Sequence, residues 1–269
     1  MPNTTSDTVK IVRFHRTGGP EVLQLDELPL PAPAAGEVRL GVKAIGLNRA
    51  EVMFRMGRYL VEPILPSKLG YEASGIVEAV GPGVDQTWIG KTVSTVPVFA
   101  ANAYGVYGEV AIVPVHALAV YPGKLSYEEG TSIWMQYITA YGALVVQGRL
   151  AKGDFVLITA ASSSVGIAAI EIAKAEGAIG IATTRTSRKK AELLALGAAH
   201  VIATEEEDLV ARSMRLHPAK APASSSIPSA EKDSMLSWQP RLPAVLSSNT
   251  ERWPLSPYSS RYSPFSASN

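Results

Sequence analysis

Three consecutive serines, Ser162–Ser164, stand between a continuous apolar run, "VLITAA", and a stretch with helical periodicity, "SVGIAAIEIAKAEG". A helix N-terminus presents unpaired backbone N–H groups and a partial positive charge, which suit a phosphate. Glycines at such a turn normally allow close approach of a pyrophosphate, whereas serines add hydroxyl donors and cap the helix well. By itself the pattern fits a nucleotide-phosphate turn as well as an ordinary capped helix.

Basic residues follow the next predicted strand, "AIGIATT", where the chain continues "RTSRKK" without an acid. A site selective for NAD normally places Asp or Glu there, to bind the ribose 2′-hydroxyl. A solvated helix start is the alternative, but cations at that end oppose the helix dipole. The cluster therefore favours a 2′-phosphate and NADP(H). The predicted cofactor-binding residues are Ser162, Ser163, Ser164, Val165, Thr184, Arg185, Arg188 and Lys189.

Alternating strands and helices around these residues predict the element that positions them. Apolar strands in "FVLITAA", "AIGIATT" and "AHVIAT" are separated by helices that end at Gly177 and Gly197. This order predicts a parallel, doubly wound α/β sheet. Before it, short β-branched runs with Gly and Pro turns predict a small antiparallel barrel. A Ser-x-x-Glu capping box at Ser126 predicts a long helix that begins the second part.

Composition divides the chain into three segments and limits its function. All 22 glycines lie at or before Gly197, which sets a boundary near residue 212. We therefore predict domains at 1–125 and 126–212, followed by a tail at 213–269. With 25 Lys+Arg against 24 Asp+Glu, the chain has no excess charge that would bind nucleic acid or a membrane surface. It has no cysteine, which excludes disulfides and thiolate metal sites. No long apolar run is present, and we expect a cytoplasmic protein.

A family resemblance covers about residues 9–212. The motifs "GLNRAEVMFRMGRY", "GYEASGIVEAVGPGV" and "TAYGAL", followed by the serine turn, resemble the medium-chain dehydrogenase/reductase superfamily, and within it the zinc-independent quinone oxidoreductases. The resemblance implies a GroES-like β-barrel domain followed by a Rossmann domain, here partial. It also implies family members that are often homodimers, although the dimer-forming region would be missing from this chain.

The same resemblance suggests the chemistry. Asn48 stands where zinc-dependent relatives carry their first cysteine ligand, and Tyr71 replaces the histidine of their "GHE" motif, so no zinc is expected. Without a Lewis acid, hydride must go to an already electrophilic carbon, as in quinones and α,β-unsaturated carbonyls. The resemblance puts Asn48 and Thr139 near the nicotinamide and Lys189 near the adenosine phosphate. It makes Tyr59 a candidate proton donor, with a half-buried loop aromatic as the equally weighted alternative.

The predicted function is therefore NADPH-dependent reduction of a small quinone or enone. Two alternatives remain open: a non-catalytic NADPH-binding protein, and an inactive, truncated remnant of such a reductase.

The tail from Ser213 is rich in Ser and Pro and has no glycine. Read with a one-base frame shift, residues 225–231 can spell "IFDPIGG" and residues 244–252 "GGIIFEYGA", both of which resemble family sequence. We expect this segment to be out of frame, whether by mutation or by sequencing error, and disordered. The nucleotide sequence decides: shifting the frame after codon 212 must open a long reading frame.

Overall fold

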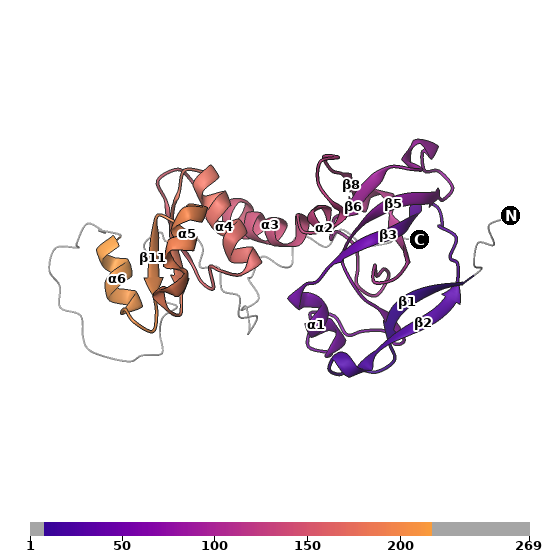
Figure 1. Cartoon of the computed structure of the whole chain (residues 1–269), viewed down its shortest axis with the longest axis horizontal. Coiled ribbons are helices and arrows are strands. Elements are labelled where there is room, and N and C mark those ends of the chain that lie inside the picture. Colours follow the sequence, from indigo (N-terminus) through magenta and orange to yellow (C-terminus); the bar gives the residue numbers. More distant parts are fainter. Residues whose placement is uncertain (1–7, 217–269) are drawn as a thin grey trace, which may run out of the picture. The chain divides into compact units, whose positions relative to one another are not determined.

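The computed structural model describes residues 8–216, which fall into two compact units (Figure 1). Unit 1 runs from Met1 to Ile138 and unit 2 from Thr139 to Asn269. The division lies later than the expected 125/126 boundary, because α2 (Tyr127–Gly130) packs on β3 and β5 of the first unit. The Ser74 hydroxyl also donates a 2.5 Å hydrogen bond to the Tyr127 carbonyl.

Unit 1 is built from two antiparallel sheets, in agreement with the predicted barrel. The larger sheet has the order β7-β3-β5-β6-β8 and the smaller has β2-β1-β4. An antiparallel bridge between Ile11 and Gly108 joins the two. The strands are β1 (Thr8–Phe14), β2 (Leu23–Pro29), β3 (Glu37–Gly46), β4 (Ser67–Lys68), β5 (Glu72–Val80), β6 (Thr92–Thr95), β7 (Val110–Pro114) and β8 (Leu118–Val120).

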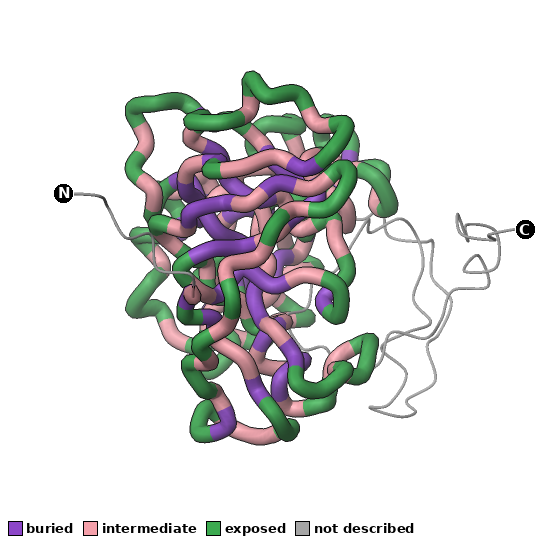
Figure 2. Tube along the Cα trace, turned by 90° about the vertical axis from the view of Figure 1, so that its right-hand side faces the viewer, coloured by how far each residue is buried: buried purple, intermediate pink, exposed green. Residues whose placement is uncertain are grey.

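The core of unit 1 lies between these sheets and helix α1 (Arg49–Arg55). Figure 2 shows buried stretches in the interior of the trace and exposed ones in its outer loops. Phe14 and Phe54 meet edge to face there, with ring centroids 5.8 Å apart. Short 3₁₀ helices, η1 (Pro20–Val22), η2 (Gln86–Trp88) and η3 (Val115–Ala117), connect the strands. The packing of Phe54 fixes α1, and with it the loop residues that precede the helix.

Unit 2 contains the predicted parallel α/β sheet. Strands β9 (Phe155–Ile158), β10 (Ile179–Thr184) and β11 (His200–Ala203) are parallel, in the order β11-β10-β9. Helix α4 (Ser164–Ala175) packs on β9 and β10, and α5 (Lys190–Leu196) packs on β11. Gly177 and Gly197 end the connecting helices with φ of 71° and 116°, a left-handed conformation that glycine adopts at little cost. A 3₁₀ turn, η5 (Ser187–Lys189), precedes α5.

The long helix predicted from Ser126 is interrupted. The capping box is present, since the Ser126 amide donates to Glu129 Oε2 at 2.8 Å, but α2 ends at Gly130. A second helix, α3 (Trp134–Tyr141), follows and continues as the π-helical segment η4 (Gly142–Gln147). The break arises because a buried carboxylate from β5, that of Glu72, accepts from the Trp134 and Met135 amides at the start of α3.

The last described helix is α6 (Leu209–Leu216). Residues 213–216, which the sequence assigns to the tail expected to be disordered, belong to this helix instead. The Arg215 side chain also donates from Nε to the Ala211 carbonyl one turn earlier, at 3.3 Å. The remainder of the predicted out-of-frame segment, 217–269, lies outside the described residues.

Candidate functional site

The serine turn begins α4 as the sequence predicts. Ser163 is the N-cap residue, and its Oγ accepts from the Gly166 amide at 3.1 Å. Ser164 and Val165 occupy the first two helical positions, where no carbonyl within the helix can accept from the amides. In the described part of the chain no other group accepts from these two amides either. Two backbone donors at the helix start are therefore available to an anion.

Close packing at this turn depends on Gly166. A Cβ placed on it would lie 2.6 Å from Ala161 Cα and 2.7 Å from the Ala160 carbonyl oxygen. Glycine thus brings the start of α4 against the end of β9. Ala160 has φ of 47°, a left-handed conformation that costs a non-glycine residue about 1–2 kcal/mol. The turn therefore combines a left-handed residue with a close helix–strand approach, although Gly166 is its one glycine.

The basic segment lies at the same edge of the sheet as the serine turn. The Ala161 amide donates to the Thr183 carbonyl at 3.1 Å, which ties the turn after β9 to the end of β10. Arg185, Arg188 and Lys189 follow and are exposed. None of the three forms a salt bridge within residues 8–216. Open amides beside unpaired cations have the chemistry that a phosphorylated nucleotide requires.

An acid does reach the basic segment, which the sequence argument did not foresee. Glu206, from the loop after β11, accepts from the Ser187 amide at 2.9 Å and from the Ser187 hydroxyl at 3.2 Å. The loop is held by the Thr204 amide, which donates to the Thr184 carbonyl at 2.8 Å. The end of β10 carries no acid, as predicted. However, a carboxylate reaches the basic segment from the loop after β11, so the expected absence of an acid is wrong for the folded chain and only the cations remain as support for NADP(H).

Ser162 and Thr139, the remaining predicted cofactor residues, are both exposed. Ser162 lies in the turn before Ser163, whereas Thr139 lies in α3. The contact of Thr139 with the nicotinamide stays a prediction.

Asn48, in unit 1, is the N-cap residue of α1 and contacts two buried glutamates. Its amide nitrogen Nδ2 donates to Glu72 Oε2 at 2.9 Å and to Glu51 Oε1 at 3.3 Å. Its backbone amide also donates to Glu51 Oε2 at 2.5 Å. Both hydrogens of the side-chain amide are thus engaged by carboxylates, so Asn48 cross-links the end of β3, α1 and β5.

Glu51 and Glu72 are only 3% and 2% exposed, and the sequence analysis missed both. Burial raises the pKa of Glu51, against the lowering effect of hydrogen bonds from Asn48 and Tyr71. The Asn-x-x-Glu spacing of a capping box was the available signal for Glu51. Glu72, an acid directly before the apolar run "ASGIV", was a weaker one.

Three tyrosines surround the Glu51 carboxylate. Burial, and then the nearby Glu51 charge, raise the pKa of Tyr59, which is half-buried in the loop after α1. Burial, Tyr59 and Glu51 raise the pKa of Tyr71 to about 12. Burial and Glu51 likewise raise the pKa of Tyr107, whose hydroxyl donates to the Gly46 carbonyl at 3.0 Å. All three phenols therefore keep their protons at neutral pH.

The two positions that carry metal ligands in zinc-dependent relatives hold other groups here. Asn48 is engaged as described above, and the Tyr71 ring packs on Phe99 with centroids 5.6 Å apart. Across the part of the chain that the structure describes, no three His, Asp or Glu side chains gather in a way that could hold a metal ion.

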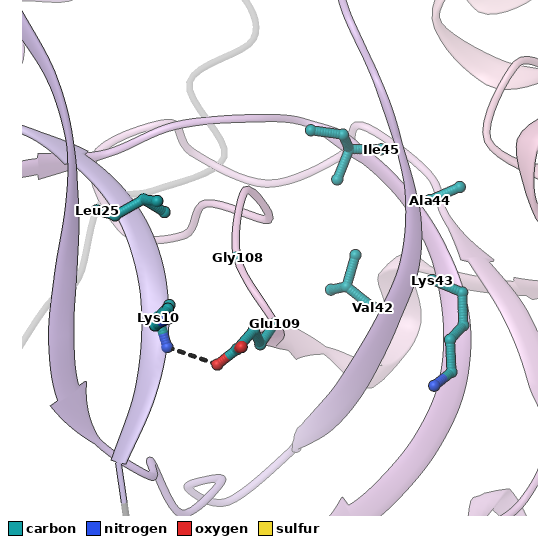
Figure 3. Close-up of a pocket in the computed structure, with 8 residues that line it drawn as sticks. All are labelled: Lys10, Leu25, Val42, Lys43, Ala44, Ile45, Gly108 and Glu109. Atoms are coloured by element: carbon teal, nitrogen blue, oxygen red, sulfur yellow. Dashed lines mark hydrogen bonds between the residues drawn. The ribbon is translucent and has the colours of Figure 1, made fainter.

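A separate hollow of about 420 Å³ opens on unit 1 (Figure 3). Val42, Ala44 and Ile45 of β3 form an apolar wall, and the Lys10 amide donates to Glu109 Oε2 at 2.7 Å on the other side. None of the predicted site residues lines this hollow, so it does not belong to the candidate active site.

The comparisons with known proteins identify the family. Residues 34–123 match the alcohol dehydrogenase GroES-like domain. Quinone oxidoreductase 1 of Escherichia coli (strain K12) is 38% identical over 201 residues, or 75% of this chain and 60% of that protein. The crystal structure of Escherichia coli quinone oxidoreductase complexed with NADPH has a TM-score of 0.68 and 35% identity, covering 77% of this chain and 62% of that chain. An NAD-dependent alcohol dehydrogenase structure has a TM-score of 0.72 and 34% identity, covering 78% and 67%.

The chain therefore belongs to the medium-chain dehydrogenase/reductase superfamily, which confirms the predicted GroES-like barrel and Rossmann-type sheet. Of the proteins named above, Quinone oxidoreductase 1 has the highest sequence identity to this chain, and the alcohol dehydrogenase structure has the higher TM-score of the two structures. This chain spans about 60% of the length of the curated relatives it matches. No helix within residues 8–216 is long and apolar enough to cross a membrane.

Proposed function

We propose that this chain carries the cofactor-binding and proton-donating residues of an NADP(H)-dependent reductase of quinones or α,β-unsaturated carbonyls. The observation that supports the cofactor most directly is the pair of open amides at Ser164 and Val165 beside the exposed cations after β10. The similarity to a quinone oxidoreductase crystallised with NADPH agrees with it. We also propose a cytoplasmic location and a division between the two domains near residue 138.

The residues present fit a dinucleotide phosphate. Gly166 lets α4 approach the strand, and its amide is taken by Ser163, while the two preceding amides, those of Ser164 and Val165, are open to an anion. Arg185, Arg188 and Lys189 supply positive charge for a 2′-phosphate. When bound, NADPH would supply the hydride for the reduction.

The chain's own contribution to the chemistry is a proton. Reduction of a quinone or an enone adds one hydride and one proton to the substrate, and a phenol can donate the proton. Tyr59 retains its proton at neutral pH because burial and the Glu51 charge raise its pKa. It is exposed enough to meet a small molecule, whereas Tyr107 is buried and its hydroxyl is engaged by Gly46. We therefore propose Tyr59 as the proton donor and Asn48 as the residue that holds the surrounding loop.

Two measurements test this proposal. Fluorescence titration of the purified chain should show NADPH binding, and NADPH oxidation should depend on an added para-quinone or enone. Tyr59→Phe should lower turnover with little change in NADPH affinity, with Tyr104→Phe as the matched control, since the Tyr104 hydroxyl instead bonds Glu37 at 2.9 Å. Chelator treatment should leave turnover unchanged. Binding without turnover would favour the non-catalytic alternative, and absence of both would favour the inactive remnant.

A further inference from the structure

The acidic run Glu205–Asp208 follows β11 and directs its carboxylates to different partners. Glu207 pairs with Arg212 at 3.2 Å and accepts from the Ala203 amide. Asp208 accepts from the Ala211 amide at 2.7 Å, at the start of α6. The Glu205 amide donates to the Arg185 carbonyl at 2.9 Å, but among these four acids only Glu206 directs its carboxylate to the basic segment after β10 within residues 8–216, through Ser187.

Glu206 occupies donors that a phosphate at this place would use. Its Oε1 accepts from both the amide and the hydroxyl of Ser187, a residue that lies between the proposed phosphate cations Arg185 and Arg188. The hydrogen bonds from Ser187, and then the charge of Lys190, lower the pKa of Glu206, so the carboxylate is ionised at neutral pH. The negative charge of Glu206 therefore lies against the basic segment after β10, whose cations favour a 2′-phosphate.

We propose that Glu206 is a specificity-determining residue that weakens binding of a 2′-phosphorylated dinucleotide and favours a free ribose 2′-hydroxyl. This inference rests on the proposed nucleotide site. A 2′-phosphate must displace Glu206 from Ser187 and then remain close to its charge, which costs affinity. A 2′-hydroxyl instead can donate a hydrogen bond to the carboxylate, which has unused lone pairs. The cations and Glu206 thus act in opposite directions on the choice between NADPH and NADH.

The decisive comparison is Glu206→Gln against Glu205→Gln, measured by calorimetric titration of NADPH and of NADH. Glutamine keeps an acceptor oxygen for Ser187, so E206Q removes the charge without removing the hydrogen bond. Glu205 lies in the same loop, where its amide donates to the Arg185 carbonyl at 2.9 Å, and its side chain makes no hydrogen bond or salt bridge within residues 8–216. E205Q therefore removes the same formal charge from the same loop without changing the contact with Ser187.

E206Q should tighten NADPH binding about five- to tenfold at low salt, as expected for removing one repulsive contact at short range in water. NADH affinity should stay the same or fall, and E205Q should change NADPH affinity by less than about twofold. The E206Q effect should shrink at 0.5 M salt because the contact is exposed and screened. A merely structural role of Glu206 would give neither the dependence on the 2′-phosphate nor the dependence on salt.

NADPH binding that E206Q leaves unchanged, or that E205Q tightens equally, would overturn the inference while leaving the proposed function intact. Absence of detectable NADPH and NADH binding to wild type and E206Q alike would overturn both. The melting temperature of E206Q, expected to match that of wild type, shows that any change in affinity does not come from unfolding.

Discussion

The contact between α4 and β9 depends on a single missing side chain, that of Gly166, and this allows a sharp mutational test. All three atoms nearest to an added Cβ belong to the backbone of Ala160 and Ala161, at 2.6–2.7 Å. Carbon atoms in contact normally lie about 3.5–4.0 Å apart. No change of rotamer can relieve a clash with backbone, so Gly166→Ala must displace the helix start.

The matched control is Gly142→Ala. Gly142 lies in the helical segment η4 of the same unit, and nothing lies within 4 Å of an added Cβ there. Replacing a helical glycine by alanine stabilises by about 1 kcal/mol. At Gly142 this gain should be realised. At Gly166 overpacking of about 1–3 kcal/mol opposes it, so the net effect should be a loss of up to about 2 kcal/mol.

Hydrogen exchange measured by mass spectrometry suits this comparison, because it reports on unit 2 separately from unit 1 and needs no two-state assumption for the whole chain. Each 1.4 kcal/mol of stability changes the opening equilibrium, and with it the exchange rate, about tenfold. Peptides from β9 and α4 should therefore exchange up to about thirtyfold faster in G166A and about fivefold slower in G142A. NADPH affinity should fall in G166A alone. Equal protection of β9 and α4 in G166A and G142A would refute the argument that close helix–strand packing requires this glycine.

Three further predictions follow from single contacts. In urea denaturation, Ala160→Gly should leave the stability of unit 2 unchanged or raise it by up to about 1 kcal/mol, because glycine adopts the φ of 47° without strain. The control Ala161→Gly should destabilise unit 2. A loss of stability in A160G would contradict the assigned backbone strain. Arg185→Ala should weaken NADPH binding by about 1.5–3 kcal/mol and leave NADH nearly unchanged, and an equal loss for both nucleotides would show that Arg185 does not contact the 2′-phosphate. Because burial raises the pKa of Glu51, the folded protein binds its proton more tightly than the unfolded chain does, so the stabilisation is present at low pH and lost as pH rises through the raised value. Urea denaturation of unit 1 from pH 4 to 8 should therefore show a decline in stability that Glu51→Gln reduces and the exposed control Glu62→Gln keeps, and identical profiles would be the contrary result.

Local sequence patterns were enough to predict the parallel sheet of unit 2, its glycine-terminated helices and the serine cap of α4. In each case the signal lies within one element or one turn, such as the Ser163 hydroxyl and the Gly166 amide three residues on. The antiparallel barrel was likewise predictable from strand alternation and turn residues. Family motifs supplied the functional interpretation of Asn48 and Tyr59, because local pattern alone indicates only an N-cap residue and a loop aromatic.

The interactions that escaped prediction join residues far apart in the chain. Glu72 accepts from the Trp134 amide 62 residues away, and this contact interrupts a helix that periodicity would continue. Glu206 bonds Ser187 across 19 residues, because β10 and β11 end side by side in the parallel sheet. A run of four acids gives no indication of which carboxylate turns back to the sheet, since that choice depends on the direction in which the loop leaves β11.

Hydrogen bonds from Asn48 to two buried carboxylates hold the loop before α1 in place. Asn48 bonds Glu51 within α1 and Glu72 on β5, and Glu72 in turn holds the start of α3. One buried network therefore connects the end of β3, α1, β5 and α3. Removing either carboxylate leaves buried amides without acceptors, at a cost of about 1–3 kcal/mol for each unsatisfied group. Besides burial, the charge of the same Glu51 carboxylate raises the pKa of Tyr59, so the network that stabilises unit 1 also acts on the proposed proton donor.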